Sequence, residues 1–146
     1  AMGFKKSLAY LSQVALHIDD QSSDGCWDNP KAAMIYVEKE LLSAGVEVVQ
    51  TNYQSLIKLS TLSVKARSGL CALRVELELE VEVMKTDNTF GARGVILWAD
   101  FFSREALISG GPEHTSKAAN DHFREFAAEL ALKVMKDTRA ARKAQQ

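Results

Sequence analysis

The stretch that decides the fold runs from residue 71 to residue 85 and reads Cys-Ala-Leu-Arg-Val-Glu-Leu-Glu-Leu-Glu-Val-Glu-Val-Met-Lys. Apolar and charged side chains alternate along it. In an extended chain one side carries Leu73, Val75, Leu77, Leu79, Val81 and Val83, and the other carries Arg74, Glu76, Glu78, Glu80 and Glu82. This period of two is typical of a half-buried β-strand. We therefore expect an apolar layer to cover one face, while the other faces water or a basic partner.

The segment before this strand predicts its hairpin partner. Residues 59–67 alternate as well, and the expected inward side chains are Leu62, Val64 and Ala66, with Ser63, Lys65 and Arg67 outward. Ser68-Gly69 suits a two-residue hairpin turn. Such a turn places Val64 opposite Leu73 and Leu62 opposite Val75, so that apolar side chains face each other across the strands.

The first third of the chain predicts a strand, a helix and a second strand. Residues 8–18 indicate a strand, and residues 19–29 a polar loop. Asn29-Pro30 is a strong helix start, because Asn caps the helix and Pro fits its first position. A buried stripe follows at residues 33, 37, 41 and 44, and Gly45 ends the helix. Residues 46–49 then begin a strand that we expect to lie parallel to the first.

The last third predicts a strand followed by a long helix. Residues 86–94 indicate a turn, and residues 95–99 are apolar on both faces of a strand that extends to about residue 108. Gly110-Gly111-Pro112 interrupts the chain. A helix is expected from Thr115 or Ser116 to about Arg139, with its buried stripe at residues 119, 123, 126, 127, 130 and 134.

Together these elements predict an α+β two-layer sandwich. We expect a mostly antiparallel sheet of about five strands, in the order β-α-β-β-β-α, with two helices packed on one face. The 146 residues suit a single domain, residues 1–146. Ala1-Met2 is typical of a cloning remnant, so we expect residues 1–7 to be non-native or flexible, and we expect residues 140–146 to fray.

The composition argues against two classes of partner. The formal net charge is −1, and such a balance gives no general attraction to nucleic acid. No apolar run reaches the roughly 20 residues that a membrane-spanning helix needs. We therefore expect no nucleic-acid partner and no transmembrane segment.

The chain has two cysteines, Cys26 and Cys71. If the first helix covers the apolar face of the Cys71 strand, a disulfide between them would join the start of the helix to the sheet. Closing a loop of this size contributes about 4 kcal/mol to stability in the chain-entropy model. Two separate buried thiols are the alternative. Neither cysteine has the spacing of a zinc or redox motif.

The loop that begins at Asp20 has part of a calcium-binding pattern. Asp20, Ser22 and Asp24 occupy the first, third and fifth positions of an EF-hand-like loop, and Gly25 follows. The twelfth position, where that motif needs a bidentate Glu, is Lys31. We therefore favour a solvated loop leading into a capped helix, and we expect no metal and no cofactor.

No catalytic motif is present. The three histidines, His17, His114 and His122, form no metal-ligand pattern, and the sequence has no serine elbow, phosphate-binding glycine loop or dinucleotide fingerprint. An acid–base pair of His114 with Glu113 or Asp121 is the remaining catalytic alternative. We therefore do not expect an enzyme.

Two surfaces are candidates for a protein partner or for self-association. Glu76, Glu78 and Glu80 form an acidic ridge that suits a basic partner, or that simply repels other sheet edges and pairs with Arg74, Lys65 or Arg67. Trp98 and Phe102 share one parity of the last strand, and an apolar second face there would suit an interface. A basic tail at residues 139–143 is ordinary for a helix end.

The arrangement resembles the small α/β domains of bacterial envelope accessory proteins, such as the N-terminal domain of TolB, the lipoprotein LptE and CsgG-like proteins. The resemblance lies in the helix start at residues 26–30, the helix end at 41–46, the Cys71 strand and the strand-to-helix segment from Val95 to Lys136. It implies an exported, non-enzymatic role in binding or assembly in the envelope. It implies no functional residue, because no defined motif is matched.

Two hypotheses follow. The first is a non-catalytic periplasmic binding or assembly module that uses its sheet surface, with an oxidised Cys26–Cys71 pair and an exposed apolar patch near Trp98. The second is a small cytoplasmic α+β enzyme or ligand-binding domain, with free thiols and a concave pocket holding a carboxylate or histidine of shifted pKa.

Overall fold

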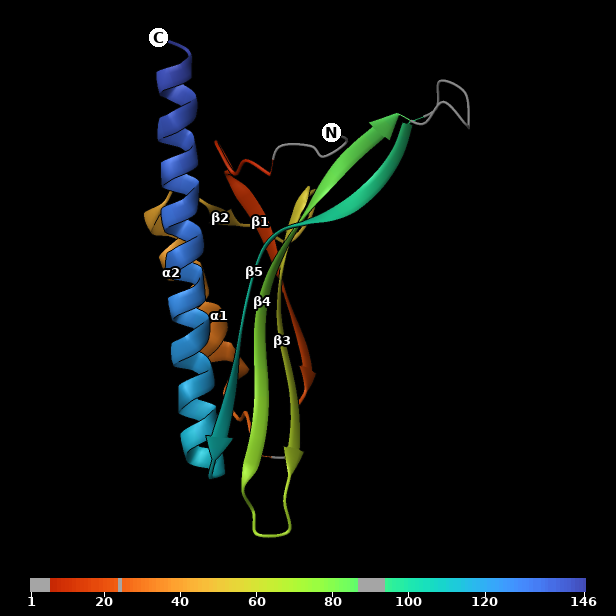
Figure 1. The fold of residues 1–146 in the computed structure, drawn as a ribbon, viewed down its shortest axis with the longest axis vertical. Coiled ribbons are helices and arrows are strands. Elements are labelled where there is room, and N and C mark those ends of the chain that lie inside the picture. Colours follow the sequence, from red (N-terminus) through yellow and green to blue (C-terminus); the bar gives the residue numbers. More distant parts are fainter. Residues whose placement is uncertain (1–5, 24, 87–93) are drawn as a thin grey trace.

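A computed structural model describes residues 6–23, 25–86 and 94–146 (Figure 1). The elements along the chain are β1 (Gln13–Gln21), α1 (Pro30–Ser43), β2 (Glu47–Val48), β3 (Ser55–Lys65), β4 (Cys71–Thr86), β5 (Gly94–Gly110) and α2 (Pro112–Ala144). The predicted α+β fold with two helices on one face is confirmed. The predicted order β-α-β-β-β-α contains four strands, whereas the structure contains five, in agreement with the expected count of about five.

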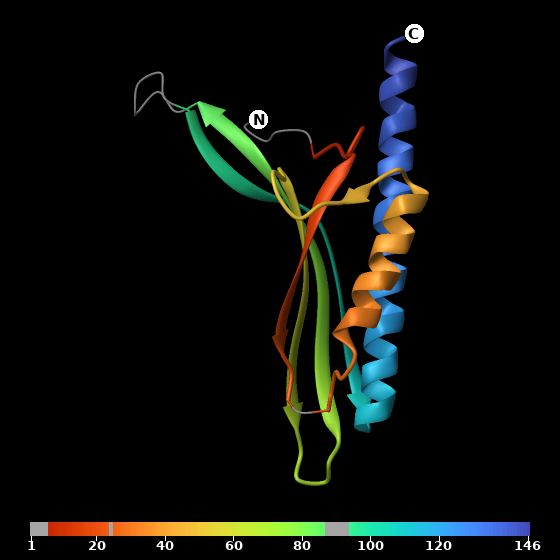
Figure 2. The same cartoon turned by 180° about the vertical axis from the view of Figure 1, so that it is seen from behind.

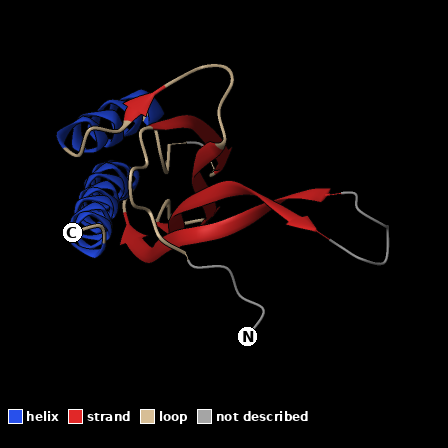
Figure 3. Cartoon of the chain, turned by 90° about the horizontal axis from the view of Figure 1, so that it is seen from above, coloured by secondary structure: helices blue, strands red, loops and turns tan. Residues whose placement is uncertain are grey.

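The five strands form one mixed sheet in the order β2-β1-β3-β4-β5. β1 lies parallel to β2 on one side and to β3 on the other, whereas β3, β4 and β5 are antiparallel neighbours. The predicted parallel crossover through the first helix is present, because Gln13 and Val14 pair with Glu47 and Val48. Viewed from above, both helices lie on the same side of the sheet (Figure 3).

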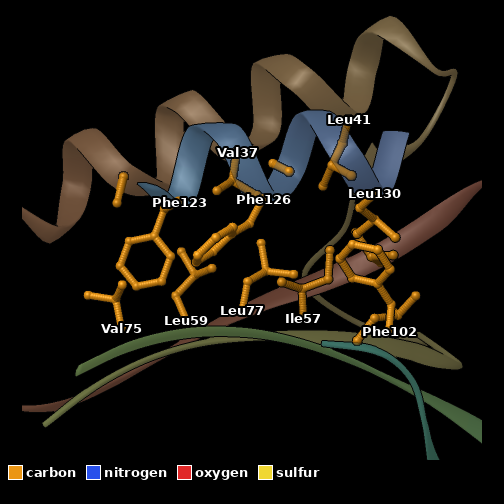
Figure 4. Close-up of a cluster of buried hydrophobic side chains, with 14 of the residues drawn as sticks. Val37, Leu41, Ile57, Leu59, Val75, Leu77, Phe102, Phe123, Phe126 and Leu130 are labelled. Carbon is orange, nitrogen blue, oxygen red and sulfur yellow. The ribbon is translucent and has the colours of Figure 1, made fainter. Parts of the chain in front are cut away.

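The core lies between the helices and the inward side of the central strands (Figure 4). Val37 and Leu41 from α1, and Phe123, Phe126 and Leu130 from α2, point toward the sheet. They meet a row of buried strand residues: Ile57, Leu59, Val75, Leu77 and Phe102. The alternation that predicted β4 is confirmed from Leu73 to Leu79, where each apolar side chain is buried.

The helix boundaries follow from local chemistry. The Asn29 side chain accepts a hydrogen bond of 3.2 Å from the Ala32 N–H, and Pro30 occupies the first turn of α1, as predicted. Gly45 adopts a positive φ of 77°, which only glycine takes without strain, and the helix ends there. α2 begins at Pro112, earlier than Thr115, and continues to Ala144, beyond the predicted end at Arg139.

The predicted register of the β3–β4 hairpin is wrong by one residue. Lys65 pairs with Cys71, Ser63 with Leu73 and Leu62 with Arg74. The loop is longer than two residues: the Ala66 N–H donates to the Leu70 carbonyl at 2.8 Å, and Gly69 takes a positive φ of 89°. This is the geometry of a three-residue hairpin loop whose last residue is left-handed.

The register decides which side chains of β3 enter the core, because a shift of one residue turns every side chain to the other face. Thr61 and Ser63 are buried, whereas Leu62 and Val64 are exposed. The prediction that Leu62 and Val64 point inward is therefore wrong. β3 also begins at Ser55, four residues before the predicted start, and supplies Ile57 and Leu59 to the core.

A β-bulge divides β5. Leu79 of β4 pairs with Phe102, but the next residue, Glu80, pairs with Asp100, so that Phe101 is the extra residue. Beyond the bulge the ends of β4 and β5 swing away from α2 as a two-stranded arm (Figures 1 and 2). Bulges bend a strand and increase its twist, which accounts for this change of direction.

Candidate functional site

The helices leave one side of the sheet without a covering element in the described part of the chain. We call this side the outer face (Figure 3); it is formed by β1, β3, β4 and β5. Arg74 and the glutamates of β4 lie on it, because they alternate with the buried residues Leu73 to Leu79. A sheet face without a covering layer normally carries polar side chains. Here it carries an apolar groove, a charged centre and an aromatic arm.

The apolar groove lies at the end of the outer face next to the β3–β4 hairpin. Leu62, Val64 and Leu107 are 53%, 71% and 83% exposed. Leu62 and Leu107 flank Arg74 on either side through the strand register. The hollow between these side chains has a volume of about 300 Å³. Apolar side chains clustered in this way are typical of a contact surface.

The charged centre follows directly along β4. The Arg74 guanidinium pairs with Glu76 at 3.1 Å and also with Glu105 from β5. Lys58 of β3 pairs with Glu80 at 3.2 Å. The acidic ridge is therefore partly neutralised locally, as one of the two interpretations expected. Arg74 was among the predicted partners, whereas Lys58 was not recognised.

Glu78 lies in the middle of the ridge. Burial raises the pKa of its carboxyl, and repulsion from Asp100, Glu76 and Glu80 raises it further, although Lys58 opposes the rise. Glu78 lines a polar hollow of about 290 Å³ that also contains Lys58 and Arg74. The centre of the outer face therefore accumulates negative charge that the neighbouring cations do not fully balance.

The aromatic arm lies beyond the bulge. Trp98 is 45% exposed and pairs in register with Glu82, and its ring centroid lies 6.3 Å from that of Tyr53. The exposed side chains of Met84 and Ile96 pair with each other next to it. The prediction that Trp98 and Phe102 share a face is wrong, because the bulge between them changes the parity. Phe102 is only 6% exposed and belongs to the core.

Cys26 and Cys71 form a disulfide, with their Cα atoms 5.9 Å apart. Both cysteines are buried. The bridge joins the segment before α1 to the first residue of β4, at the same end of the molecule as the apolar groove. The predicted pairing is therefore present, and the alternative of two buried thiols is wrong.

Hydrogen bonds fix the residues after Cys26 to the first turns of α2. The indole N–H of Trp27 donates to the Asn120 side chain at 2.8 Å, within the core. The Asp28 N–H donates to the Ser116 hydroxyl at 2.9 Å, and the Thr115 hydroxyl donates to the Cys26 carbonyl at 2.9 Å. We call this cluster the corner. It fixes the end of the sheet that carries the apolar groove.

Asp20, from the candidate calcium loop, has a structural role. It belongs to β1, which extends to Gln21 beyond the predicted end at residue 18. Its carboxylate accepts hydrogen bonds from the N–H and hydroxyl of Ser22 and from the hydroxyl of Thr61. Burial acts to raise the pKa of Asp20, but these hydrogen bonds outweigh it and lower that pKa. Asp24 lies outside the described residues.

The histidines do not gather into a site. His17 lies on the outer face opposite Lys58, His114 lies in the first turn of α2, and His122 packs on Phe126. Asp121 pairs with Lys117 at 2.8 Å and with Arg124 at 3.4 Å. The ring of His114 lies under Gly110, where a β-carbon would come within 2.7 Å of it. His114 thus packs against the backbone at the end of β5.

The described residues 6–23, 25–86 and 94–146 contain no group of three or more His, Cys, Asp or Glu arranged to hold a metal ion. Over the same ranges, no helix combines the length and the apolar character that crossing a membrane requires.

Sequence reasoning missed the apolar groove and the corner. The groove exists because the observed hairpin register turns Leu62 and Val64 outward. The signal in the sequence was Gly69, which suits the left-handed third residue of a three-residue loop. The corner has no sequence signal, because Trp27 and Asn120 are 93 positions apart.

No protein-family model matches the chain, and no curated protein matches it. Among solved structures, the PelC dodecamer from Paraburkholderia phytofirmans is similar over 86% of this chain and 89% of that chain, with 12% sequence identity and a TM-score of 0.47. A minor lipoprotein from Acinetobacter baumannii is similar over 92% of this chain and 95% of that chain, with 12% identity and a TM-score of 0.41. Both likenesses are distant, with TM-scores below 0.5.

Proposed function

We propose that this chain is a non-catalytic accessory protein of the bacterial envelope, located in the periplasm, which binds or assembles with a protein partner through the outer face of its sheet. The observation that carries this proposal is the apolar groove beside the charged centre. Leu62, Val64 and Leu107 expose most of their surface on a face that no described element covers. Removing such side chains from water on contact with a partner is favourable by about 25 cal/mol per Å².

The disulfide supports the location. Structural disulfides persist in oxidising compartments such as the periplasm and are rare in the cytosol. Cys26 and Cys71 are bonded to each other. A chain whose thiols pair in this way suits an exported protein.

The cytoplasmic enzyme hypothesis has less support. It expected free thiols, which the Cys26–Cys71 bond contradicts. The hollow around Glu78 contains a carboxylate of raised pKa, as that hypothesis also expected, but none of the three histidines lines it. Burial, together with repulsion from the neighbouring carboxylates, accounts for the raised pKa of Glu78 without a catalytic role.

Site-specific photo-crosslinking in the native host cells tests the proposed surface. A photoreactive amino acid replaces Leu107, and a matched variant carries it at Glu125, an exposed position on α2. We expect a discrete protein adduct from position 107 and none from position 125. The absence of an adduct from position 107, or equal labelling from both positions, contradicts binding through the outer face.

Thiol labelling tests the location. An alkylating reagent is added to intact cells before lysis, and the mass of the purified protein is measured without reductant. We expect no alkylation, a mass two hydrogens below that of the dithiol, and recovery in the periplasmic fraction. Two alkylated thiols and recovery in the cytosol would contradict export.

A further inference from the structure

We infer that the partner of the outer face is a second copy of this chain, which inserts the C-terminal end of its helix α2 into the apolar groove and onto the charged centre. This inference rests on the proposed function and deepens it by naming the partner. Copies would then join head to tail, with two different surfaces in each contact.

The C-terminal end of α2 exposes apolar side chains followed by cations, which complement the apolar groove and the acidic centre of the outer face. Its last residue in the core is Val134, and beyond it the helix continues past β2 (Figures 1 and 2). Met135, Arg139 and Arg142 line an open hollow next to Ser43 and Ala44, at the end of α1. Leu132, two residues before Val134, and Met135, directly after it, expose large apolar side chains. Arg139 and Arg142 follow along the same stripe, because residues three or four apart lie on one helix face. We call these four residues the tail stripe.

The two surfaces match in order and in length. The tail stripe begins with apolar residues and ends with cations, while the outer face passes from the apolar groove to the acidic centre. Leu132 and Arg142 are about 15 Å apart along a helix that rises about 1.5 Å per residue. Arg74, between the groove leucines, and Glu78 are about 13 Å apart along a strand that rises about 3.3 Å per residue. Both contacts therefore form at once.

Charge favours this occupant. Carboxylates outnumber cations around Glu78, and repulsion among them helps to raise its pKa. Arg139 and Arg142 of the tail stripe and the neighbouring Lys136 and Lys143 are cationic and exposed. A cation beside Glu78 relieves the repulsion, so contact stabilises both surfaces. Complementary charge of this kind sets the orientation and the partner more than the total affinity.

A single copy cannot make this contact within itself. α2 lies on the helix side of the sheet, and its C-terminal end is at the opposite end of the molecule from the β3–β4 hairpin, where the groove lies (Figure 1). The sheet separates the tail stripe from its own groove. A contact between two unlike surfaces repeats from copy to copy, and it gives a ring if the rotation closes or a filament if it does not.

Three double or triple variants test the inference. The tail variant carries Met135→Gln, Arg139→Gln and Arg142→Gln, and the face variant carries Glu78→Gln and Leu107→Gln. The control variant carries Ile35→Gln and Lys39→Gln, which remove one exposed apolar side chain and one exposed charge from α1. Circular dichroism and thermal unfolding establish that each variant is folded.

Sedimentation at low ionic strength gives the mass of each protein over a range of concentrations. We expect the wild type and the control variant to grow beyond dimers as concentration rises, and salt to weaken this growth. We expect the tail and face variants to associate at least about tenfold more weakly. An equal mixture of the two should form a heterodimer and stop there, because each retains one intact surface.

Other outcomes overturn the inference. A wild type that remains monomeric at every concentration, or variants that associate as the wild type does, would exclude the contact. A mixture that fails to pair would exclude unlike surfaces. The photo-crosslinking experiment separates this failure from failure of the proposed function. An adduct of position 107 with a different protein would support the binding face but exclude a second copy as the partner. The absence of any adduct would contradict binding through the outer face.

Discussion

Glu78 is a residue whose ionisation the fold disfavours. Because its pKa is raised in the folded state, first by burial and then by neighbouring carboxylates, the folded protein binds its proton more tightly than the unfolded chain does. The resulting contribution to stability is fully present below the ordinary carboxyl pKa, and it is lost as pH rises through the folded pKa.

Glu78→Gln is therefore expected to stabilise the isolated protein at neutral pH. The gain in melting temperature should shrink as pH falls and vanish below the ordinary carboxyl pKa, because both side chains are then uncharged. Thermal unfolding at several pH values, in dilute protein, measures this difference. Glu125→Gln, on the exposed side of α2, is the control. A gain that is independent of pH would contradict the electrostatic origin.

Asn120 is a second residue with a measurable role, since its side chain accepts the buried indole N–H of Trp27. Asn120→Ala leaves this donor without a partner, and we expect a loss of about 1–3 kcal/mol in the free energy of unfolding. In a Trp27→Phe background the donor is absent, so the same substitution should cost less. Urea unfolding of the four proteins gives the coupling energy. Equal losses in both backgrounds would show that the hydrogen bond does not matter.

At the scale of the elements, β4 shows how far a sequence pattern reaches. Its alternation predicted the strand and its buried side, because a period of two has one structural meaning when it persists. The same reasoning failed for β3, where both parities carry apolar residues and only the loop selects the register. An alternating pattern of apolar residues predicts a strand and its two faces. Where both faces carry apolar residues, as in β3, the loop geometry decides which face is buried.

The hairpin register makes opposite predictions for two neighbouring positions. Val64→Lys should change the free energy of unfolding by less than about 0.5 kcal/mol, because Val64 is exposed. Leu73→Ala, in the core on the adjacent strand, should cost about 2–5 kcal/mol. Denaturant titrations of both variants measure these values. A large loss for Val64→Lys would indicate the register that was predicted from a two-residue turn.

The bulge in β5 explains the second failure at this scale. Parity placed Trp98 and Phe102 together, but one extra residue between them places Phe102 in the core and leaves Trp98 on the arm. Nothing in the local sequence marks Phe101 as that residue. The candidate site was therefore predicted in part: the acidic ridge followed from the β4 pattern, whereas the apolar groove required the three-dimensional register.

The disulfide also acts between elements, since it joins the segment before α1 to the first residue of β4. Cys26→Ala combined with Cys71→Ala should lower the free energy of unfolding by about 4 kcal/mol, because the unfolded chain regains the entropy of an open loop. Reduction of the wild type should have a similar effect, and reductant should leave the double variant unchanged. Stability that does not respond to reductant in either protein would contradict this expectation.

At the scale of the whole molecule, its two ends differ. One end contains the corner, the disulfide and the apolar groove, whereas the other contains the arm and the tail stripe (Figure 1). Asp137 helps to hold the second end together, since its carboxylate accepts the Leu8 N–H at 2.9 Å and pairs with Lys133. The structure thus separates a covalently fixed end from an end held by weaker contacts.

The disulfide also limits how far the chain can be stretched. When the two termini are pulled apart, the 45 positions that separate Cys26 from Cys71 bear no tension while the bond is intact. Fully extended, they correspond to about 150 Å of contour length at about 3.3–3.6 Å per residue. In single-molecule stretching, the reduced chain should therefore lengthen by about 150 Å more than the oxidised chain. The extension of one molecule under load then reports whether its Cys26–Cys71 bond is intact.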